Sequence, residues 1–208
     1  MLVRNGKGDK MKVIGITGGV GCGKSFIMEQ LQERYQAGII LTDLVAHDLM
    51  EPGGISYQEI VACFGTKILQ SDGKINRQAL GAIVFEDKES LLKLNSITHP
   101  NVKKEVIRRI EEMKRAKEVS IIMVEAALLI EEHYDEICDE LWFIDASDEV
   151  RIKRLMEKRG YTKEKCLSIM SNQLQRERFL EHCQRVIYNN KTKEDAIAQL
   201  DAIMKEVL

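Results

Sequence analysis

Residues 18–25 read Gly-Gly-Val-Gly-Cys-Gly-Lys-Ser and fit the pattern G-x-x-x-x-G-K-[ST]. An apolar, β-branched run at 12–17 precedes them, and apolar side chains at helical spacing follow over 27–35. A glycine-rich loop between a strand and a helix can wrap its N–H groups around a phosphate, while the helix N-terminus adds partial positive charge. The alternative, a glycine-rich turn that binds nothing, seldom carries the complete pattern in this context. We therefore predict a phosphate-binding loop that opens an α/β fold.

The residue types in this loop predict distinct tasks. The Lys24 ammonium would reach the β- and γ-phosphates of a nucleotide, and the Ser25 hydroxyl would hold Mg²⁺. Cys22 allows two interpretations: a thiol whose pKa falls at the helix N-terminus, so that its modification blocks ATP, or a small residue where larger ones would clash. The residues expected to contact ATP here are Gly18, Gly19, Gly21, Cys22, Gly23, Lys24, Ser25 and Phe26.

Four further apolar runs predict the rest of a parallel sheet. They lie at 39–41, 120–124, 140–144 and 186–188, and they alternate with helical patterns. Gly38 is expected to end the first helix, and Pro100 to stand where a new helix begins. Turn signals at 51–54 and 72–73 interrupt a helical segment between the second and third strands, and Thr-Lys-Glu-Asp at 192–195 predicts a capping box before the last helix.

The composition favours one globular domain over residues 11–208. Hydrophobic residues make up 44% of the 208, and 31 Lys and Arg nearly balance 33 Asp and Glu, which argues against binding to nucleic acid or an anionic membrane. No apolar stretch approaches the roughly 20 residues that span a bilayer, so we expect a cytoplasmic protein. The polar residues 1–10 are interpreted as a flexible extension or as the result of a misplaced start, because Met11 follows them.

Phosphate binding alone does not distinguish a kinase from a nucleotide switch. The guanine-reading motif Asn-Lys-x-Asp is absent, since 189–192 reads Asn-Asn-Lys-Thr, which argues against a GTPase. Glu125 ends the run at 121–124, where its carboxylate would either reach Mg²⁺ through water or lie exposed at a strand end.

With the loop, Asp43, Arg77, Thr98-His99-Pro100 and residues 154–159 in this order, the sequence resembles dephospho-CoA kinases from about Lys12 onward. The resemblance implies transfer of phosphate from ATP to the ribose 3′-hydroxyl of dephospho-CoA, the last step of coenzyme A biosynthesis. It also implies an α/β fold of the P-loop nucleoside monophosphate kinase type, a five-stranded parallel sheet flanked by helices, with a helical substrate-binding insertion at about 55–118 and a lid at about 150–180. The implied ligands are ATP, Mg²⁺ and dephospho-CoA, bound by a monomer or weak homo-oligomer.

The resemblance also assigns residues to the acceptor. The family's Asp-x-Asp segment appears here as Leu41-Thr42-Asp43, so catalytic duty falls on Asp43; read without the family, Asp43 is a helix N-cap. Arg77 is a candidate clamp on the acceptor, with a solvated helix-start arginine as the alternative, and His99 is expected to position substrate. The family's Asp-x-Pro-Leu-Leu-Phe-Glu appears at 125–131 without its proline, and it implies acceptor contacts from Glu125 and Leu128.

The lid pattern is carried by Arg154 and Arg159. On a continuous helix the two guanidinium groups would lie about 140° apart, so we expect Gly160 to end the helix and both groups to fold over the ATP phosphates. A basic, solvated helix face that includes Arg151 is the alternative. Asn189 lies in a segment that resembles the family's adenine-pocket Val-Ile-Asp-Asn, with Tyr188 in place of the acid. Another small-metabolite or nucleotide kinase, or a non-catalytic nucleotide switch, remains an alternative function.

Overall fold

The computed structural model describes residues 11–208, so the extension predicted at 1–10 lies outside the described residues. The described chain forms two compact units. One comprises residues 11–39 and 112–208, and the other comprises residues 40–111. The insertion expected at about 55–118 overlaps the second unit.

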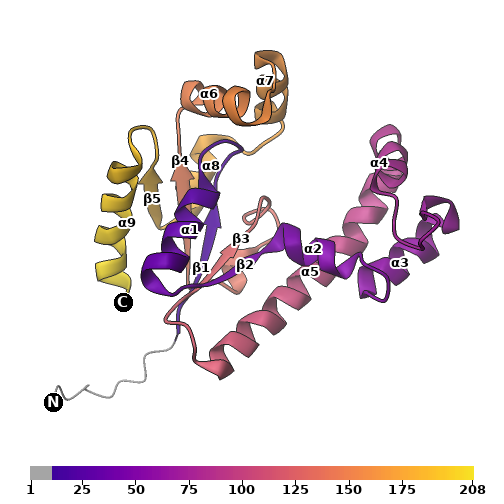
Figure 1. The fold of residues 1–208 in the computed structure, drawn as a ribbon, viewed down its shortest axis with the longest axis horizontal. Helices are drawn as coiled ribbons and strands as arrows, with labels where there is room; N and C mark the ends of the chain where they lie inside the picture. Colours follow the sequence, from indigo (N-terminus) through magenta and orange to yellow (C-terminus); the bar gives the residue numbers. More distant parts are fainter. Residues whose placement is uncertain (1–10) are drawn as a thin grey trace. The chain divides into compact units, whose positions relative to one another are not determined.

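A five-stranded sheet is the centre of the fold, with the strand order β2-β3-β1-β4-β5 (Figure 1). Pairings of β1 with β3 and β4, and of β4 with β5, are parallel. All of β1 is buried, as expected of a strand covered on both faces. The five predicted strands are confirmed as β1 (Val13–Thr17), β2 (Gly38–Leu41), β3 (Ile122–Glu125), β4 (Glu140–Asp145) and β5 (Arg185–Tyr188).

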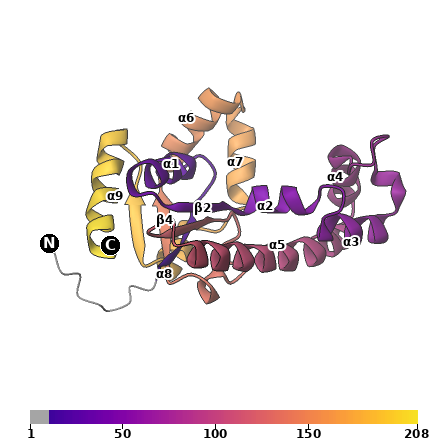
Figure 2. The ribbon, with the colours of Figure 1, turned by 60° about the horizontal axis from the view of Figure 1, so that its bottom comes forward.

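Helices flank the strands of the first unit (Figures 1 and 2), and the two over residues 148–159 and 163–171 lie beyond the carboxyl end of β4 in Figure 1. Helix α9 packs beside α1 and β5, and α8 packs on β4, where the Phe179 ring stacks on Phe143 at 4.8 Å between centroids. The capping box at Thr192 and Asp195 is present as predicted. These helices are α1 (Lys24–Tyr35), α6 (Asp148–Arg159), α7 (Lys163–Ser171), α8 (Arg176–His182) and α9 (Lys193–Val207).

The role predicted for Gly38 is wrong. Helix α1 ends at Tyr35, and its C-cap is Gln36 in the left-handed conformation, with its N–H bonded to the Leu31 carbonyl. Gly38 instead begins β2, where an added Cβ would lie 2.8 Å from the Met113 sulfur. The glycine therefore serves close packing rather than helix termination.

The second unit is helical, as expected, with turns at 51–54 and 72–73. Its helices are α2 (Thr42–Leu49), α3 (Ile55–Phe64), α4 (Arg77–Glu86) and most of α5 (Lys88–Ala116), with a short 3₁₀ turn at Thr66–Ile68. Its core is a buried cluster of Ile60, Phe64, Ile68, Ile75 and Leu80.

Pro100 does not begin a helix, contrary to the prediction, but lies inside the 29-residue α5. Proline lacks the N–H that would bond the carbonyl four residues earlier, which costs about 3 kcal/mol in a helix interior. Buried side chains continue at helical spacing after it, at Val102, Val106 and Ile110, and their burial outweighs this cost. None of the helices in residues 11–208 is both long and apolar enough to cross a membrane.

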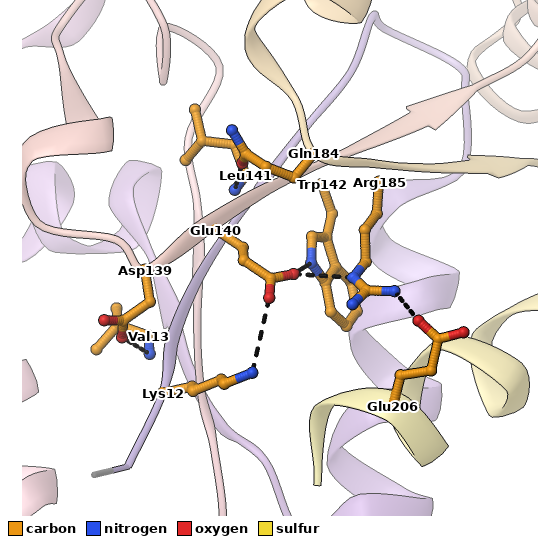
Figure 3. Close-up of polar contacts among 9 residues, drawn as sticks. All are labelled: Lys12, Val13, Asp139, Glu140, Leu141, Trp142, Gln184, Arg185 and Glu206. Atoms are coloured by element: carbon orange, nitrogen blue, oxygen red, sulfur yellow. Dashed lines mark hydrogen bonds and ion pairs between the residues drawn. The ribbon is translucent and has the colours of Figure 1, made fainter.

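A polar network stabilises the amino-terminal edge of the sheet, away from the phosphate-binding loop (Figure 3). Glu140 accepts hydrogen bonds from the Trp142 indole N–H at 3.0 Å and from Arg185 Nε at 2.9 Å, and it pairs with Lys12 at 3.6 Å. Arg185 also donates to Glu206 at 2.6 Å, which joins β5 to α9. The network therefore links β4, β5, the residue before β1 and the last helix.

Replacing Glu140 by Leu should lower the free energy of unfolding at pH 7 by about 2 kcal/mol, because two donors and a charge lose their partner. Burial opposes ionisation of Glu140, but the bonds from Trp142 and Arg185 prevail and lower its pKa below 4.5. Its contribution is thus complete above about pH 4.5 and is lost as the pH falls through the lowered pKa. Urea unfolding at several pH values should show wild type and variant converging in acid.

Glu206→Gln is the matched control, since it removes the exposed carboxylate from the same network and should cost under about 0.5 kcal/mol. Equal losses in the two variants would show that Glu140 is not the centre of the network.

Candidate active site

The phosphate-binding loop connects β1 to α1 and has the backbone that its glycines permit. Gly21 and Gly23 have φ values of 80° and 96°, in the left-handed region that residues with a Cβ seldom adopt. Gly23 is the N-cap of α1, and no side chain caps the first amides of that helix. These amides and the helix dipole together form a site suited to an anion.

Lys24 is held at the mouth of this loop. Its Nζ donates to the Gly18 carbonyl at 2.8 Å and lies 3.6 Å from Glu125 Oε1. The side chains of Lys24 and Glu125 are each 17% exposed. The ammonium is therefore screened from bulk water and lies beside the loop amides that would bind phosphate.

Glu125 and Ser25 supply oxygen atoms suited to Mg²⁺. Glu125 is the last residue of β3 and faces Lys24, so the alternative of an exposed strand end is wrong. Ser25, the second residue of α1, is exposed. Residues 11–208 contain no group of three His, Cys, Asp or Glu side chains arranged to hold a metal. Mg²⁺ ordinarily needs one or two protein oxygens besides water and phosphate, so this pair fits it.

Arg154 and Asn189 converge on the outer side of the loop. Arg154 donates through Nη1 to the Cys22 carbonyl at 3.2 Å and through Nη2 to the Asn189 carbonyl at 2.9 Å. The buried Asn189 amide donates to the same Cys22 carbonyl at 2.8 Å. An added Cβ on Gly23 would lie 2.2 Å from Asn189 Nδ2, so only glycine fits there. Both side chains predicted at the ATP site therefore contact the loop.

The second lid arginine is placed differently. Gly160 ends α6 in the left-handed conformation, with φ 63°, as predicted. Because Arg159 is the last residue of the helix, it still lies about 140° around the axis from Arg154, and its side chain is exposed. The helix end does not bring the two guanidinium groups together, and a contact of Arg159 with ATP stays a prediction.

Cys22 is a packed residue rather than a reactive one. Its side chain is 1% exposed, and its sulfur lies 2.9 Å from the position of an added Cβ on Gly18. Burial raises the pKa of the Cys22 thiol, in spite of the opposing charges of Lys24 and Arg151. The hypothesis of a lowered pKa is wrong, and the interpretation as a small residue in a confined space holds.

Two residues at the loop are not identified by the sequence pattern. Arg151, which the pattern places on a solvated basic face, donates to the Val20 carbonyl. Gln173, which belongs to no motif, accepts from the Val20 N–H. The glycine at position 19 was the one sequence feature that could have indicated Arg151. Its backbone needs no positive φ, but an added Cβ would lie 2.4 Å from Arg151 Nη2, so the glycine makes room for that side chain.

A cavity of about 710 Å³ adjoins the loop within the first unit. Phe143 and Phe179 line it on one side, and the buried Asp145 lines it with Arg176, whose Nη2 lies 2.7 Å from the Asp145 carboxylate. The bond with Asp145 raises the pKa of Arg176. The cavity therefore combines aromatic walls with a neutralised polar pair next to Gly19.

The expected acceptor residues Asp43, Arg77 and His99 belong to the second unit. Asp43 is exposed in the first turn of α2, and because the N-cap is Leu41, the interpretation of Asp43 as an N-cap is wrong. Arg77 is the exposed first residue of α4 and lines a cavity of about 350 Å³ with Lys74, which pairs with Glu51 at 2.9 Å. His99 is partly exposed within α5. Their action together with the loop stays a prediction.

Leu128 lies in the first unit, in the turn after β3, and is 43% exposed. An exposed leucine close to Glu125 in the chain is suited to an apolar part of a ligand. Its contact with the acceptor is likewise a prediction.

Comparisons with known proteins show which family the chain resembles. A family model described as dephospho-CoA kinase matches residues 12–195. A dephospho-CoA kinase of Carboxydothermus hydrogenoformans is 36% identical over 94% of each chain, and one of Listeria monocytogenes is 39% identical over 91% of this chain and 94% of the relative. A crystal structure from Thermus thermophilus has a TM-score of 0.80 at 25% identity, covering 96% of this chain and all of the other.

Two further solved structures support the fold. A dephospho-CoA kinase from Campylobacter jejuni has a TM-score of 0.71 at 23% identity, covering 94% of this chain and 96% of the other. A shikimate kinase from Acinetobacter baumannii has a TM-score of 0.53 at 14% identity, covering 96% and 97%. The predicted fold, a five-stranded parallel sheet of the P-loop kinase type, is confirmed.

Proposed function

The chain belongs to the dephospho-CoA kinase family, whose reaction is ATP-dependent phosphorylation of dephospho-CoA in coenzyme A biosynthesis, and we propose that its described loop and lid residues carry this reaction. The observation that supports the assignment of residues most directly is the position of Lys24. Its ammonium lies between Gly18 and Glu125, next to the uncapped N-terminus of α1.

The loop holds the phosphates of ATP and orients the γ-phosphoryl group. Phosphoryl transfer proceeds through a loose transition state, so positioning and charge stabilisation account for most of its catalysis. The amides at the start of α1 bind phosphate oxygens, and Lys24 exchanges its bond to the Gly18 carbonyl for one to the β- and γ-phosphates. Arg154, held at the Cys22 carbonyl, adds positive charge on the lid side.

Mg²⁺ would be held by the Ser25 hydroxyl and, through water, by Glu125. When bound, the ion neutralises charge on the β- and γ-phosphate oxygens. Glu125 has a second task, because its carboxylate lies 3.6 Å from the Lys24 ammonium and orients it.

For the acceptor we propose roles for residues of the second unit and, separately, for Leu128 of the first unit. Asp43 orients the ribose 3′-hydroxyl and takes its proton, while Arg77, His99 and Leu128 bind the rest of dephospho-CoA. The exposed first-turn position of Asp43 suits contact with a ligand. We further propose that the protein works in the cytoplasm as a monomer or weak homo-oligomer.

A coupled ADP assay with a panel of acceptors tests this function. With Mg-ATP present, we expect fast ADP formation with dephospho-CoA, and little with AMP, with shikimate or without acceptor. Mass spectrometry of the product should show one added phosphate, and ³¹P NMR should place it on the 3′-oxygen. Preference for another acceptor would identify a different kinase, and slow turnover that no acceptor raises would identify a nucleotide switch.

A further inference from the structure

Arg151 and Gln173 satisfy both backbone polar groups of Val20, at the tip of the phosphate-binding loop. Arg151 Nε donates to the Val20 carbonyl at 2.9 Å, and the Val20 N–H donates to Gln173 Oε1 at 3.0 Å. The ring closes because Arg151 Nη2 donates to the same Gln173 oxygen at 2.8 Å. Val20 is thus held by Arg151 of α6 and by Gln173, which lies two residues after the end of α7.

The geometry assigns Arg151 to the loop rather than to a ligand. Each of its three guanidinium nitrogens has a partner, since Nη1 donates to Asp148 at 3.2 Å, and its side chain is only 15% exposed. Gln173 lies two residues after the end of α7, where its backbone N–H donates to the Met170 carbonyl at 3.1 Å. Both side chains are therefore held by contacts within the protein itself.

The glycines of the loop make room for this arrangement. An added Cβ on Gly19 would lie 2.4 Å from Arg151 Nη2, and one on Gly21 would lie 3.0 Å from the Arg151 carbonyl and 3.2 Å from Leu155 Cγ. Helix α6 thus approaches the loop closely at Arg151 and Leu155. Part of the glycine pattern serves contact with the lid segment, in addition to the backbone conformation that phosphate binding needs.

We propose that Arg151 and Gln173 form a latch that couples the lid segment to the phosphate-binding loop and holds the loop in its ATP-binding conformation. The two residues act as positioning residues, through Val20, and neither touches the reacting atoms. A loop ordered in advance loses less conformational freedom on binding, so the latch raises ATP affinity. The proposal rests on the proposed function only in taking ATP as the nucleotide.

The test measures Mg-ATP dissociation constants by titration calorimetry without any acceptor. Gln173→Met keeps side-chain length and Arg151→Met keeps only an apolar stem, both lose the polar atoms, and each should raise Kd about tenfold. The double variant should also bind about tenfold more weakly, not a hundredfold, because the latch is already open in either single variant. Gln173→Glu retains the acceptor oxygen and should stay within about threefold of wild type.

Amide exchange of Val20, followed by NMR in the nucleotide-free protein, gives a readout that a merely structural role would not reproduce. Val20 should lose protection in Gln173→Met and keep it in Gln173→Glu. Unchanged Kd values, or a double variant whose loss equals the product of the single losses, would overturn the latch. If Arg151→Met does not fold, the Gln173 pair decides alone. The ATP titration contains no acceptor, so its outcome does not depend on which acceptor the protein phosphorylates. Failure to phosphorylate dephospho-CoA would refute the proposed function but would leave the test of the latch valid.

Discussion

Replacement of Lys24 by Ala is expected to lower kcat for phosphoryl transfer by at least about 10³-fold, the size typical of losing a charged group that stabilises the transition state. The Lys24 ammonium lies between the Gly18 carbonyl and Glu125, in a setting with little water, where its charge acts strongly on a phosphate. The variant also leaves Glu125 without this partner, so the melting temperature should fall by a few degrees. Steady-state ADP production and thermal unfolding measure the two effects.

Lys12→Ala is the matched control for this change. Lys12 precedes β1 at the opposite edge of the sheet, where it pairs with Glu140 at 3.6 Å. Lys12→Ala removes the same ammonium group as Lys24→Ala. Its turnover should stay within about twofold of wild type, because exposed ion pairs contribute little to stability and Lys12 lies away from the loop. Near-normal turnover in Lys24→Ala, with the fold intact, would show that this lysine does not act on phosphate.

Much of the fold could be predicted because short, contiguous stretches of the chain determine several of its elements. The strands at 13–17 and 140–145 are apolar runs bounded by turn residues, and the helix that ends at Gly160 carries its own stop signal. The loop at 18–25 is contiguous, so the roles proposed for Lys24 and Ser25 rest on a single motif.

The predictions for Pro100 and Gly38 failed because they relied on local preferences that tertiary packing overrides. Pro100 disfavours a helix interior, yet buried side chains after it keep α5 continuous. Glycine is a residue that commonly ends helices, but Gly38 is needed for another reason. Its lack of a side chain leaves room for Met113, 75 positions away in the sequence. A pattern within a few residues cannot reveal such a contact.

Residues at the candidate site were missed for the same reason. Arg151 bonds to Val20 across 131 positions, and Gln173 across 153. The sequence alone places Arg151 among basic neighbours on a helix, which is typical of a solvated face. Its true environment depends on how α6 approaches the loop, and only the folded structure shows that.

Asp43→Asn is expected to lower kcat by about 10²-fold or more while ATP affinity stays near that of wild type. Asn keeps the size and one acceptor oxygen of Asp but cannot take a proton from a ribose hydroxyl. Asp43 is the acidic residue in the first turn of α2, and it follows β2, at whose carboxyl end α/β proteins bind ligands. With Leu41 two positions before it, that segment contains no second carboxylate to replace it. Turnover with dephospho-CoA and calorimetric ATP binding on the same preparation measure the two quantities.

The alternative role of Asp43, a helix N-cap, makes the opposite prediction, because Asn caps helices as well as Asp does. The structure already argues against it, since the N-cap is Leu41 and the cap forms no side-chain hydrogen bond. Loss of the Asp43 charge near the start of α2 should cost about 0.5 kcal/mol of stability, too little to change turnover. Asp48→Asn makes the same chemical change at the other end of α2, where Asp48 pairs with Arg109 at 2.8 Å, and should keep near-normal turnover. If Asp43→Asn and Asp48→Asn turn over equally well, Asp43 has no part in activating the acceptor.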